Sequence, residues 1–310
     1  MTAIPAIRLR NLRKHFGARV ALAGIDLDLA GAQLVGVVGP DGAGKTTLLR
    51  ALAGLLEIEA DEAEVLGYGL AGDVRELKAQ IGYVPQAFSL PRDLSVMENL
   101  RLAARLHQLP RAEFERRAAA LLERTGLAPF RDRPAGALSG GMRQKLAVSC
   151  ALLPEPGLLL LDEPTAGVDV IARDEIWAML RARCGSAVIL ISTSYLEEVA
   201  ACERLVYLDG GRVVAMGTPD ELRASVSIEL YRAWGDQPQA IARAARGLPY
   251  VSEARATGRF ARVEVACADT PGAPQVLRDL AALPAGVRVA EQAPIDMEAT
   301  LLHLARGPQV

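Results

Sequence analysis

The chain has 310 residues, of which 51% are hydrophobic and 23% are charged, and its formal net charge is −2. This composition is typical of a globular protein with room for two domains, and it offers no overall positive charge to attract nucleic acid. The cysteines stand singly and no long uncharged apolar run occurs, which argues against a zinc site, a disulfide framework, a signal peptide and a membrane span.

The first thirty residues have the alternating pattern of antiparallel strands, at 7–10 and again at 25–29. Phe16 lies between these segments, shortly before the strand that leads into a glycine-rich loop. From the residues alone, two interpretations of Phe16 stay open. The ring is either part of the core or a surface on which a nucleotide base stacks.

The glycine-rich loop follows a short apolar run at 34–38 and continues into a leucine-rich segment. Residues 39–46 fit the pattern G-x-x-x-x-G-K-[ST], and the order strand, loop, helix is the one that a phosphate-binding P-loop requires. Glycines let backbone N–H groups surround a phosphate, and the helix N-terminus points at the same anion. Lys45 is placed to reach the β- and γ-phosphates, and the Thr46 hydroxyl is placed to ligate Mg²⁺. The candidate ATP-binding residues are Phe16, Gly39, Pro40, Asp41, Gly42, Ala43, Gly44, Lys45, Thr46 and Thr47.

A strand at 81–84 ends at Pro85, and Gln86 is the first polar side chain beyond it. Ligand groups gather at strand tips in α/β sheets, so Gln86 is a candidate for contact with Mg²⁺ or the attacking water. A solvated loop glutamine is the alternative. Residues 88–135 have helical periodicity and many charged residues, which predicts a helical insertion, with the α/β pattern resuming near residue 146.

A second helix start with free backbone N–H groups is predicted at 139–141, where Ser139 can cap the helix. A buried strand then ends in two carboxylates, Asp162 and Glu163. Asp162 suits Mg²⁺ ligation through water, and Glu163 is placed to polarise the water that attacks the γ-phosphate. We expect the last strand of the core sheet at 187–192, and a separate β-hairpin at 204–215.

Together these motifs resemble the nucleotide-binding subunit of an ATP-binding cassette (ABC) transporter, over residues 6–225. In this family's terms, residues 39–46 are the Walker A motif, Gln86 the Q-loop, 138–144 the signature, 158–163 the Walker B motif, and 166–169, ending at Asp169, the D-loop. The LSGG signature is the specific element, because many NTPases share the P-loop. The resemblance implies a P-loop NTPase (ABC ATPase) core, spanning 1–225, with an antiparallel β subdomain and the helical insertion. It also favours the stacking role for Phe16.

The resemblance further implies that two subunits pack head to tail. Each ATP would be held by the P-loop of one subunit and by Ser139, Gly140 and Gly141 of the other. The implied cofactors are ATP and Mg²⁺, the latter held by Thr46, Gln86 and Asp162. The implied partners are a second ABC subunit, in a homodimer or heterodimer, and an integral membrane permease that the helical insertion contacts; no nucleic acid is expected. The chain would be cytoplasmic and peripheral on the inner face of the cell membrane.

One position departs from the family. A histidine that contacts the γ-phosphate usually follows the strand after Walker B, and Ser194 stands at this site. A hydroxyl can bond a phosphate oxygen, but it is shorter than an imidazole and never cationic. Because Glu163 is intact, we expect real but reduced ATPase activity, with Glu163, Gln86 and Ser194 as the catalytic candidates. The alternatives are a slowly hydrolysing regulatory subunit and a soluble ABC ATPase without a membrane partner.

Residues 226–310 lie beyond the cassette and have the pattern β-α-β-β-α-β with a closing helix, which predicts a small ferredoxin-like α/β domain. The strands are expected at 227–234, 250–256, 260–265 and 287–291, and the helices at 239–246, 274–283 and 295–305. No catalytic constellation stands out, and we interpret Asp269 and Asp296 as turn or cap residues. Similar tails occur on cassettes that serve ABC-2-type exporters, so the resemblance implies export. The tail is a candidate dimerisation or regulatory element.

Overall fold

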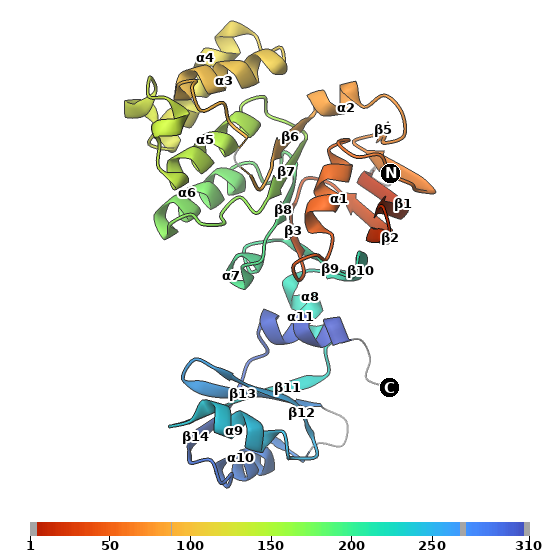
Figure 1. Ribbon diagram of the computed structural model, residues 1–310, viewed down its shortest axis with the longest axis vertical. Helices are drawn as coiled ribbons and strands as arrows, with labels where there is room; N and C mark the ends of the chain where they lie inside the picture. Colours follow the sequence, from red (N-terminus) through yellow and green to blue (C-terminus); the bar gives the residue numbers. More distant parts are fainter. Residues whose placement is uncertain (1–4, 88, 267–270, 307–310) are drawn as a thin grey trace. The chain divides into compact units, whose positions relative to one another are not determined.

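The computed structural model describes residues 5–87, 89–266 and 271–306 (Figure 1). The chain divides into two compact units, Met1–Thr218 and Pro219–Val310. The division falls before the expected boundary at residue 225. The reason is that helix α8 (Pro219–Ser225) packs against α11 (Met297–Arg306), which belongs to the second unit.

A six-stranded sheet forms the centre of the first unit, in the order β10-β9-β3-β8-β7-β6. Its strands are β3 (Leu34–Val38), β6 (Ile81–Val84), β7 (Leu158–Asp162), β8 (Val188–Ser192), β9 (Arg204–Asp209) and β10 (Arg212–Gly217). Strands β9 to β6 are parallel, and every residue of β3, β7 and β8 is buried, as strands covered on both faces require.

The hairpin at the end of this unit is not separate from the core sheet. Strand β10 pairs antiparallel with β9, as expected, but β9 also pairs in parallel with β3. The prediction that 187–192 is the last strand of the core sheet is therefore wrong. Hairpin periodicity specifies the local partner of a strand and leaves its other edge open, and here that edge is filled by the strand that leads into the P-loop.

A second, antiparallel sheet has the order β2-β1-β4-β5. Its strands are β1 (Pro5–Phe16), β2 (Arg19–Ala30), β4 (Glu62–Val65) and β5 (Tyr68–Gly69). The first two strands are longer than the sequence pattern indicated, so Phe16 lies at the very end of β1, beside the hairpin turn. Apolar side chains of this sheet and of the central sheet enclose α1 (Lys45–Leu52) in one hydrophobic core.

Helices α3 (Val96–Leu106) and α4 (Arg111–Arg124) form the predicted helical insertion, followed by short 3-10 turns at Ala128–Phe130 and Ala135–Ala137. Residue 88, the first of the predicted range, lies outside the described residues. The insertion continues through α5 (Gly140–Leu152), because Leu146 and Leu153 belong to the same hydrophobic cluster as Val96 of α3. Helix α5 also packs against β6 and α6 (Val170–Arg181), and the next strand is β7, so the expected return to α/β structure near 146 stays a prediction. The remaining helices of this unit are α2 (Arg75–Ala79) and α7 (Leu196–Val199).

The second unit has an antiparallel sheet in the order β12-β13-β11-β14. Its elements in chain order are β11 (Ile228–Gly235), α9 (Pro238–Ala245), β12 (Val251–Thr257), β13 (Phe260–Ala266), α10 (Ala273–Ala281), β14 (Val287–Ala293) and α11. This is the predicted β-α-β-β-α-β order. Both α9 and α10 contribute to one apolar cluster with alternate residues of β11 and β13, such as Tyr231 and Val263.

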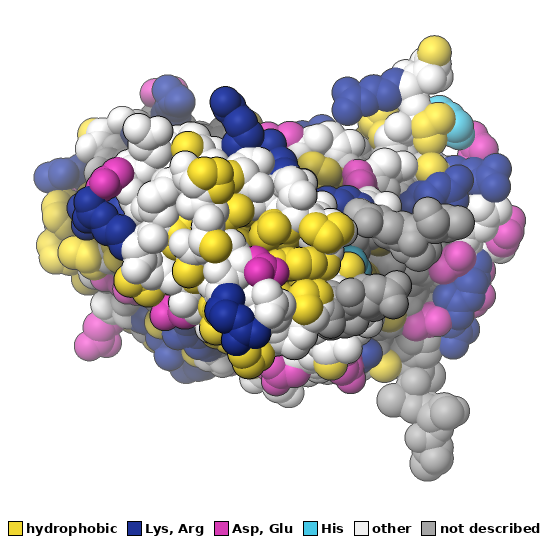
Figure 2. All heavy atoms as spheres, turned by 90° about the horizontal axis from the view of Figure 1, so that it is seen from below, with side chains coloured by type: hydrophobic (Ala, Val, Ile, Leu, Met, Phe, Trp, Pro, Cys, Tyr) yellow, Lys and Arg dark blue, Asp and Glu magenta, His cyan; other side chains and the backbone are white. Residues whose placement is uncertain are grey.

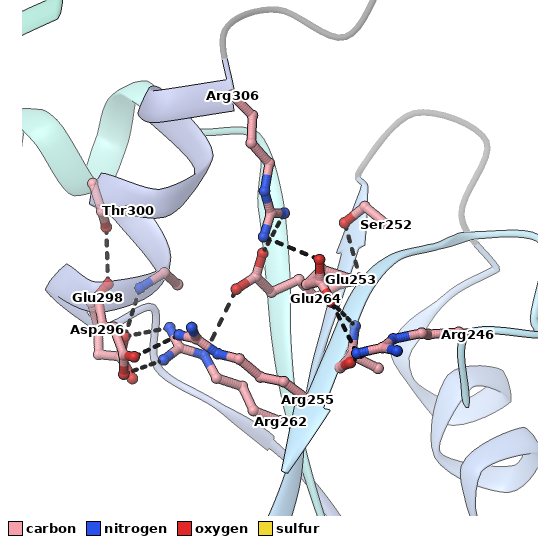
Figure 3. A network of polar contacts seen from close by, with 12 residues as sticks. Arg246, Ser252, Glu253, Arg255, Arg262, Glu264, Asp296, Glu298, Thr300 and Arg306 are labelled. Atoms are coloured by element: carbon pink, nitrogen blue, oxygen red, sulfur yellow. Dashed lines mark hydrogen bonds and ion pairs between the residues drawn. The ribbon is translucent and has the colours of Figure 1, made fainter. Parts of the chain in front are cut away.

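A network of charged side chains joins the sheet of this unit to α11 (Figure 3). Arg262, only 3% exposed, forms ion pairs of 2.6 Å with Asp296 and Glu298. Glu264, 1% exposed, pairs with Arg306 at 3.3 Å. Asp296 also accepts a hydrogen bond from the backbone of Ala299, so it is the helix cap that the sequence predicted. Asp269, interpreted in the same way, lies outside the described residues.

On the face of the molecule shown in Figure 2, charged side chains of both signs are scattered around a central group of apolar ones. Such mixing is consistent with the near-zero formal net charge of the chain, −2. Among the helices that the structure describes, none has the length and apolar character needed to cross a membrane.

Candidate active site

A cavity of about 260 Å³ lies between the P-loop, the β1–β2 hairpin and the ends of β6 and β7. Its lining residues are Phe16, Arg19, Ala21, Asp41, Gly42, Ala43, Gly44, Lys45, Thr46, Thr47, Gln86 and Glu163. Segments that are far apart in the sequence thus meet at the carboxyl ends of the parallel strands, where open α/β sheets bind ligands.

The P-loop has the backbone that its glycines predict. Gly39 and Gly44 have φ angles of 151° and 109°. A Cβ at Gly39 would lie 2.1 Å from the carbonyl oxygen of Leu208, and one at Gly44 would lie 2.7 Å from that of Ala21. Lys45 is 6% exposed, and its Nζ donates hydrogen bonds to the carbonyls of Gly39 (2.7 Å) and Pro40 (3.1 Å). These hydrogen bonds hold the Lys45 ammonium group close to the P-loop backbone that is expected to bind phosphate.

Phe16 is not part of the core. Its side chain is 48% exposed and lines the cavity, and the ammonium of Lys14 lies 5.3 Å from the ring centroid. This position is compatible with base stacking, which stays a prediction. Arg19, at the start of β2, lines the same cavity and was not singled out from the sequence. Its place directly after the two-residue turn that follows the candidate aromatic residue was the available signal.

Asp162 ends β7 and is completely buried. Its Oδ1 accepts hydrogen bonds from the hydroxyls of Thr46 (3.0 Å) and Ser192 (2.7 Å). Its Oδ2 is buried and has no hydrogen-bond partner within the described part of the chain. An unpaired buried carboxylate oxygen is costly, and oxygen donors are what Mg²⁺ prefers, so the donor set fits this ion. Among the described residues, no group of three or more acidic, His or Cys side chains is placed to hold a metal ion.

Glu163 has a left-handed backbone, with φ at 49°, which is uncommon for a residue other than glycine. Its backbone N–H donates to the Ser192 hydroxyl at 2.9 Å. Its carboxylate lies between two side chains: Gln86 Nε2 donates to Oε2 and Ser194 Oγ donates to Oε1, each at 3.0 Å. The structure therefore brings the three catalytic candidates together. Strained backbone of this kind persists where surrounding contacts hold it, often at functional sites.

Ser192 is a second residue that the sequence analysis missed. It is fully buried at the end of β8, and its hydroxyl bonds both Asp162 and the backbone of Glu163. A serine at the end of an apolar strand was the only local signal, because the two carboxylates that it contacts lie about 30 residues earlier in the chain.

The signature residues lie elsewhere on the unit and do not line this cavity, as far as the described residues go. Ser139 caps α5 by accepting a hydrogen bond from the backbone of Met142 at 3.3 Å. Asp169 caps α6 in the same way, through the backbone of Ala172 at 3.0 Å. The two helix starts are close together, since a Cβ at Gly141 would lie 3.1 Å from the Asp169 carboxylate. The unit therefore has two separate helix N-termini of the kind that can bind anions, one after the P-loop and one at the signature.

Several relatives of the chain are named as ATP-binding proteins. Residues 22–166 match the family model described as ABC transporter. A Nod factor export ATP-binding protein I from Ralstonia nicotianae is 36% identical over 76% of this chain and 75% of its own length. The daunorubicin resistance ATP-binding protein DrrA3 from Streptomyces coeruleorubidus is 40% identical, over 71% of this chain and 70% of its own length.

The chain belongs to the ABC transporter family. Another member, the probable multidrug ABC transporter ATP-binding protein YbhF from Escherichia coli, is 39% identical over 86% of this chain. The chain spans about half of that relative, 47% of its length.

Solved structures of the family have the same fold as the first unit. One described as the ATP-binding subunit of an ABC transporter has a TM-score of 0.64 and 32% identity, over 71% of this chain and 92% of its own. A dimeric cassette, MJ0796, described as a post-hydrolysis state bound to ADP and Pi, has a TM-score of 0.63 and 25% identity, over 68% of this chain and 98% of its own. The predicted ABC ATPase fold is thus confirmed.

Proposed function

We propose that this ABC protein is the ATP-binding subunit of an exporter and hydrolyses ATP to drive transport through a separate membrane permease. The observation that carries the proposal is the convergence of Lys45, Gln86 and Glu163 on one cavity next to an exposed aromatic ring. A cationic loop for phosphates, a carboxylate for the attacking water and a surface for the base are the parts that ATP hydrolysis requires.

Each residue has a role that its contacts support. The P-loop backbone and Lys45 bind the β- and γ-phosphates, and Phe16 stacks on the base. Thr46, Asp162 and Gln86 hold Mg²⁺, which neutralises phosphate charge when it is bound. Glu163 accepts a proton from the attacking water, and Gln86 and Ser194 orient its carboxylate.

The second anion-binding helix end serves the partner subunit. Ser139, Gly140 and Gly141 start α5 away from the cavity, so they bind the γ-phosphate of an ATP held by a second cassette. ATP then lies between two subunits and holds them together until it is cleaved. The dimeric cassette among the similar structures supports this arrangement.

The second proposed partner is an integral membrane permease. Binding to this permease holds the chain at the inner face of the cell membrane. Export is supported by the names of the relatives, which refer to multidrug, Nod factor and daunorubicin proteins. Because these names refer to unrelated molecules, no single cargo follows for this chain.

The test is turnover of MgATP by the purified chain, compared with its Glu163→Gln variant. We expect slow hydrolysis that the substitution lowers about a hundredfold, since general-base catalysis contributes about 10²–10⁴. Equal rates for the two proteins would overturn the role of Glu163. The permease is tested by affinity purification of the tagged chain from detergent-solubilised membranes, where a multi-spanning membrane protein should copurify.

Ser194 motivates one alternative, a regulatory subunit that binds ATP and barely cleaves it. In that case the chain alone would bind MgATP without measurable turnover. Hydrolysis would then appear only after mixing with a second cassette that has a histidine at this position.

A further inference from the structure

Glu198 is a buried acidic residue for which the proposed mechanism has no role. It lies on the short helix α7 and is 4% exposed. Its two carboxylate oxygens accept from two different threonines: Oε1 from the Thr165 hydroxyl and Oε2 from the Thr193 hydroxyl, each at 2.5 Å. A carboxylate that uses both oxygens in this way ties together the segments that carry its donors.

These two segments lie next to two of the catalytic candidates, Glu163 and Ser194. Thr165 follows Glu163 by two residues, and Thr193 immediately precedes Ser194. Both threonines are almost completely buried, at 1% and 2% exposure. The loop that carries Ser194 is thus anchored through its neighbour, while Ser194 itself is exposed.

Arg173 and the backbone of Tyr195 make further contacts with Glu198 and Thr193. Arg173 of α6 places Nε 3.8 Å from Glu198 Oε1, and its guanidinium lies 4.8 Å from the ring centroid of Tyr195. The backbone N–H of Tyr195 donates to the Thr193 hydroxyl at 3.0 Å. The buried charge of Glu198 therefore has an arginine close by, as buried carboxylates require.

We propose that Glu198 is a positioning residue that sets the distance between Ser194 and Glu163. It acts through Thr165 on the segment after Glu163 and through Thr193 on the segment before Ser194. The inference rests on the proposed ATP hydrolysis with Glu163 as the base. It adds that the position of the Glu163 carboxylate depends on Glu198, which is not among the residues that line the nucleotide cavity.

Two conservative variants test the link. Glu198→Gln keeps the shape of the side chain but replaces one acceptor oxygen by an NH₂ donor, and Thr193→Val removes one of the two anchoring hydroxyls with little change of volume. Thr125→Val is the matched control, because Thr125 is equally buried and its hydroxyl bonds the backbone of Leu121 at 2.7 Å, within the helical insertion.

We expect each test variant to lower kcat about fivefold and to change the KM for ATP less than twofold, with Thr125→Val near wild type in both. In a Ser194→Ala background, Glu198→Gln should lower kcat less than twofold further, because the contact that it positions is already gone. An equal effect in both backgrounds, or a raised KM with unchanged kcat, would overturn the proposal.

A second readout is independent of turnover. Hydrogen exchange measured by mass spectrometry should be faster in Glu198→Gln than in wild type across peptides covering 163–169 and 193–195, and unchanged there in Thr125→Val. Unchanged exchange in both peptides would refute the link even if the protein hydrolyses ATP. If the wild type shows no turnover, the proposed function fails, and the exchange experiment still decides whether Glu198 joins the two segments.

Discussion

Ser194 Oγ donates a hydrogen bond of 3.0 Å to Oε1 of Glu163, and Gln86 donates to the other oxygen of the same carboxylate. The carboxylate proposed as the base is therefore held from two sides by uncharged donors. In the family that this chain belongs to, a histidine usually stands where Ser194 does. The hydroxyl orients the carboxylate, but it has neither the length nor the charge of an imidazolium.

The Ser194 contact predicts opposite effects for two substitutions. Ser194→Ala should lower kcat about three- to tenfold, because it removes a hydrogen bond to a charged group worth about 1 kcal/mol at this exposed position. Ser194→His should raise turnover above wild type, since an imidazole reaches further toward the γ-phosphate. Steady-state ATPase assays at saturating MgATP measure both. A histidine variant slower than the alanine variant would contradict this account.

Asp162 predicts how the site depends on metal. Chelation with EDTA should abolish turnover, and added Mg²⁺ should restore it. Asp162→Asn should raise the Mg²⁺ concentration needed for half-maximal rate about tenfold or more, because it removes the negative charge from the buried group with the unpaired Oδ2. A titration of turnover with Mg²⁺ at fixed ATP measures this shift. An unchanged midpoint would exclude Asp162 from metal binding.

Alanine substitutions at Gly140 and Gly141 should have different effects: the one at Gly141 should lower folding stability, and the one at Gly140 should weaken the dimer. A Cβ at Gly141 would lie 2.9 Å from Cβ of Ala172, so Gly141→Ala should destabilise the first unit by about 1–3 kcal/mol through overpacking. A Cβ at Gly140 would meet no heavy atom within 4 Å in the described part of the chain. Gly140→Ala should therefore leave stability unchanged or slightly higher.

The two glycine variants are compared by urea unfolding for stability. For assembly, gel filtration with MgATP in the Glu163→Gln background reports the dimer. We expect Gly140→Ala to fold normally but to weaken the ATP-dependent dimer, because its methyl group points to the surface where the partner's phosphate would approach. Normal dimers of Gly140→Ala would count against a role of the signature in trans.

Arg262 predicts a large loss of stability in the second unit. Arg262→Met would remove the 2.6 Å partner of Asp296 and one of the two arginines that pair with Glu298, beside a nearly inaccessible Glu264 (Figure 3). Because the two acids are 41% and 37% exposed, we expect a loss of about 2–3 kcal/mol, the range for hydrogen bonds to charged groups, below the cost of breaking a fully buried pair. The matched control is Arg288→Met, which breaks a pair with Asp236 whose side chains are 69% and 75% exposed, and which should cost less than about 1 kcal/mol.

This comparison uses urea unfolding of the full chain, with hydrogen exchange in β13 to assign the transition to the second unit. Similar stability of the two variants would mean that the apolar cluster under α9 and α10 holds this unit, and that the charged face is dispensable.

The local sequence pattern was sufficient to predict most helices and strands and to propose the candidate site residues. The P-loop, the capped helix at Ser139 and the buried strand before Asp162 each depend on neighbouring residues, through turn geometry, capping and periodicity. The same holds for the elements of the second unit, whose alternation and helix periods predicted their order along the chain. Such features are readable because a residue and its next few neighbours determine them.

Contacts between distant residues were decided only by the tertiary structure. Gln86 and Glu163 are 77 residues apart, Thr46 and Asp162 are 116 apart, and Thr165 and Glu198 are 33 apart. Strand β9 joins the central sheet and α5 joins the helical cluster for the same reason, since each has a second surface that its own periodicity leaves without a partner. The sequence by itself determined which chemistry the chain carries. Only packing over long range decided which side chains hold Glu163 in place, because closing those loops depends on the whole core.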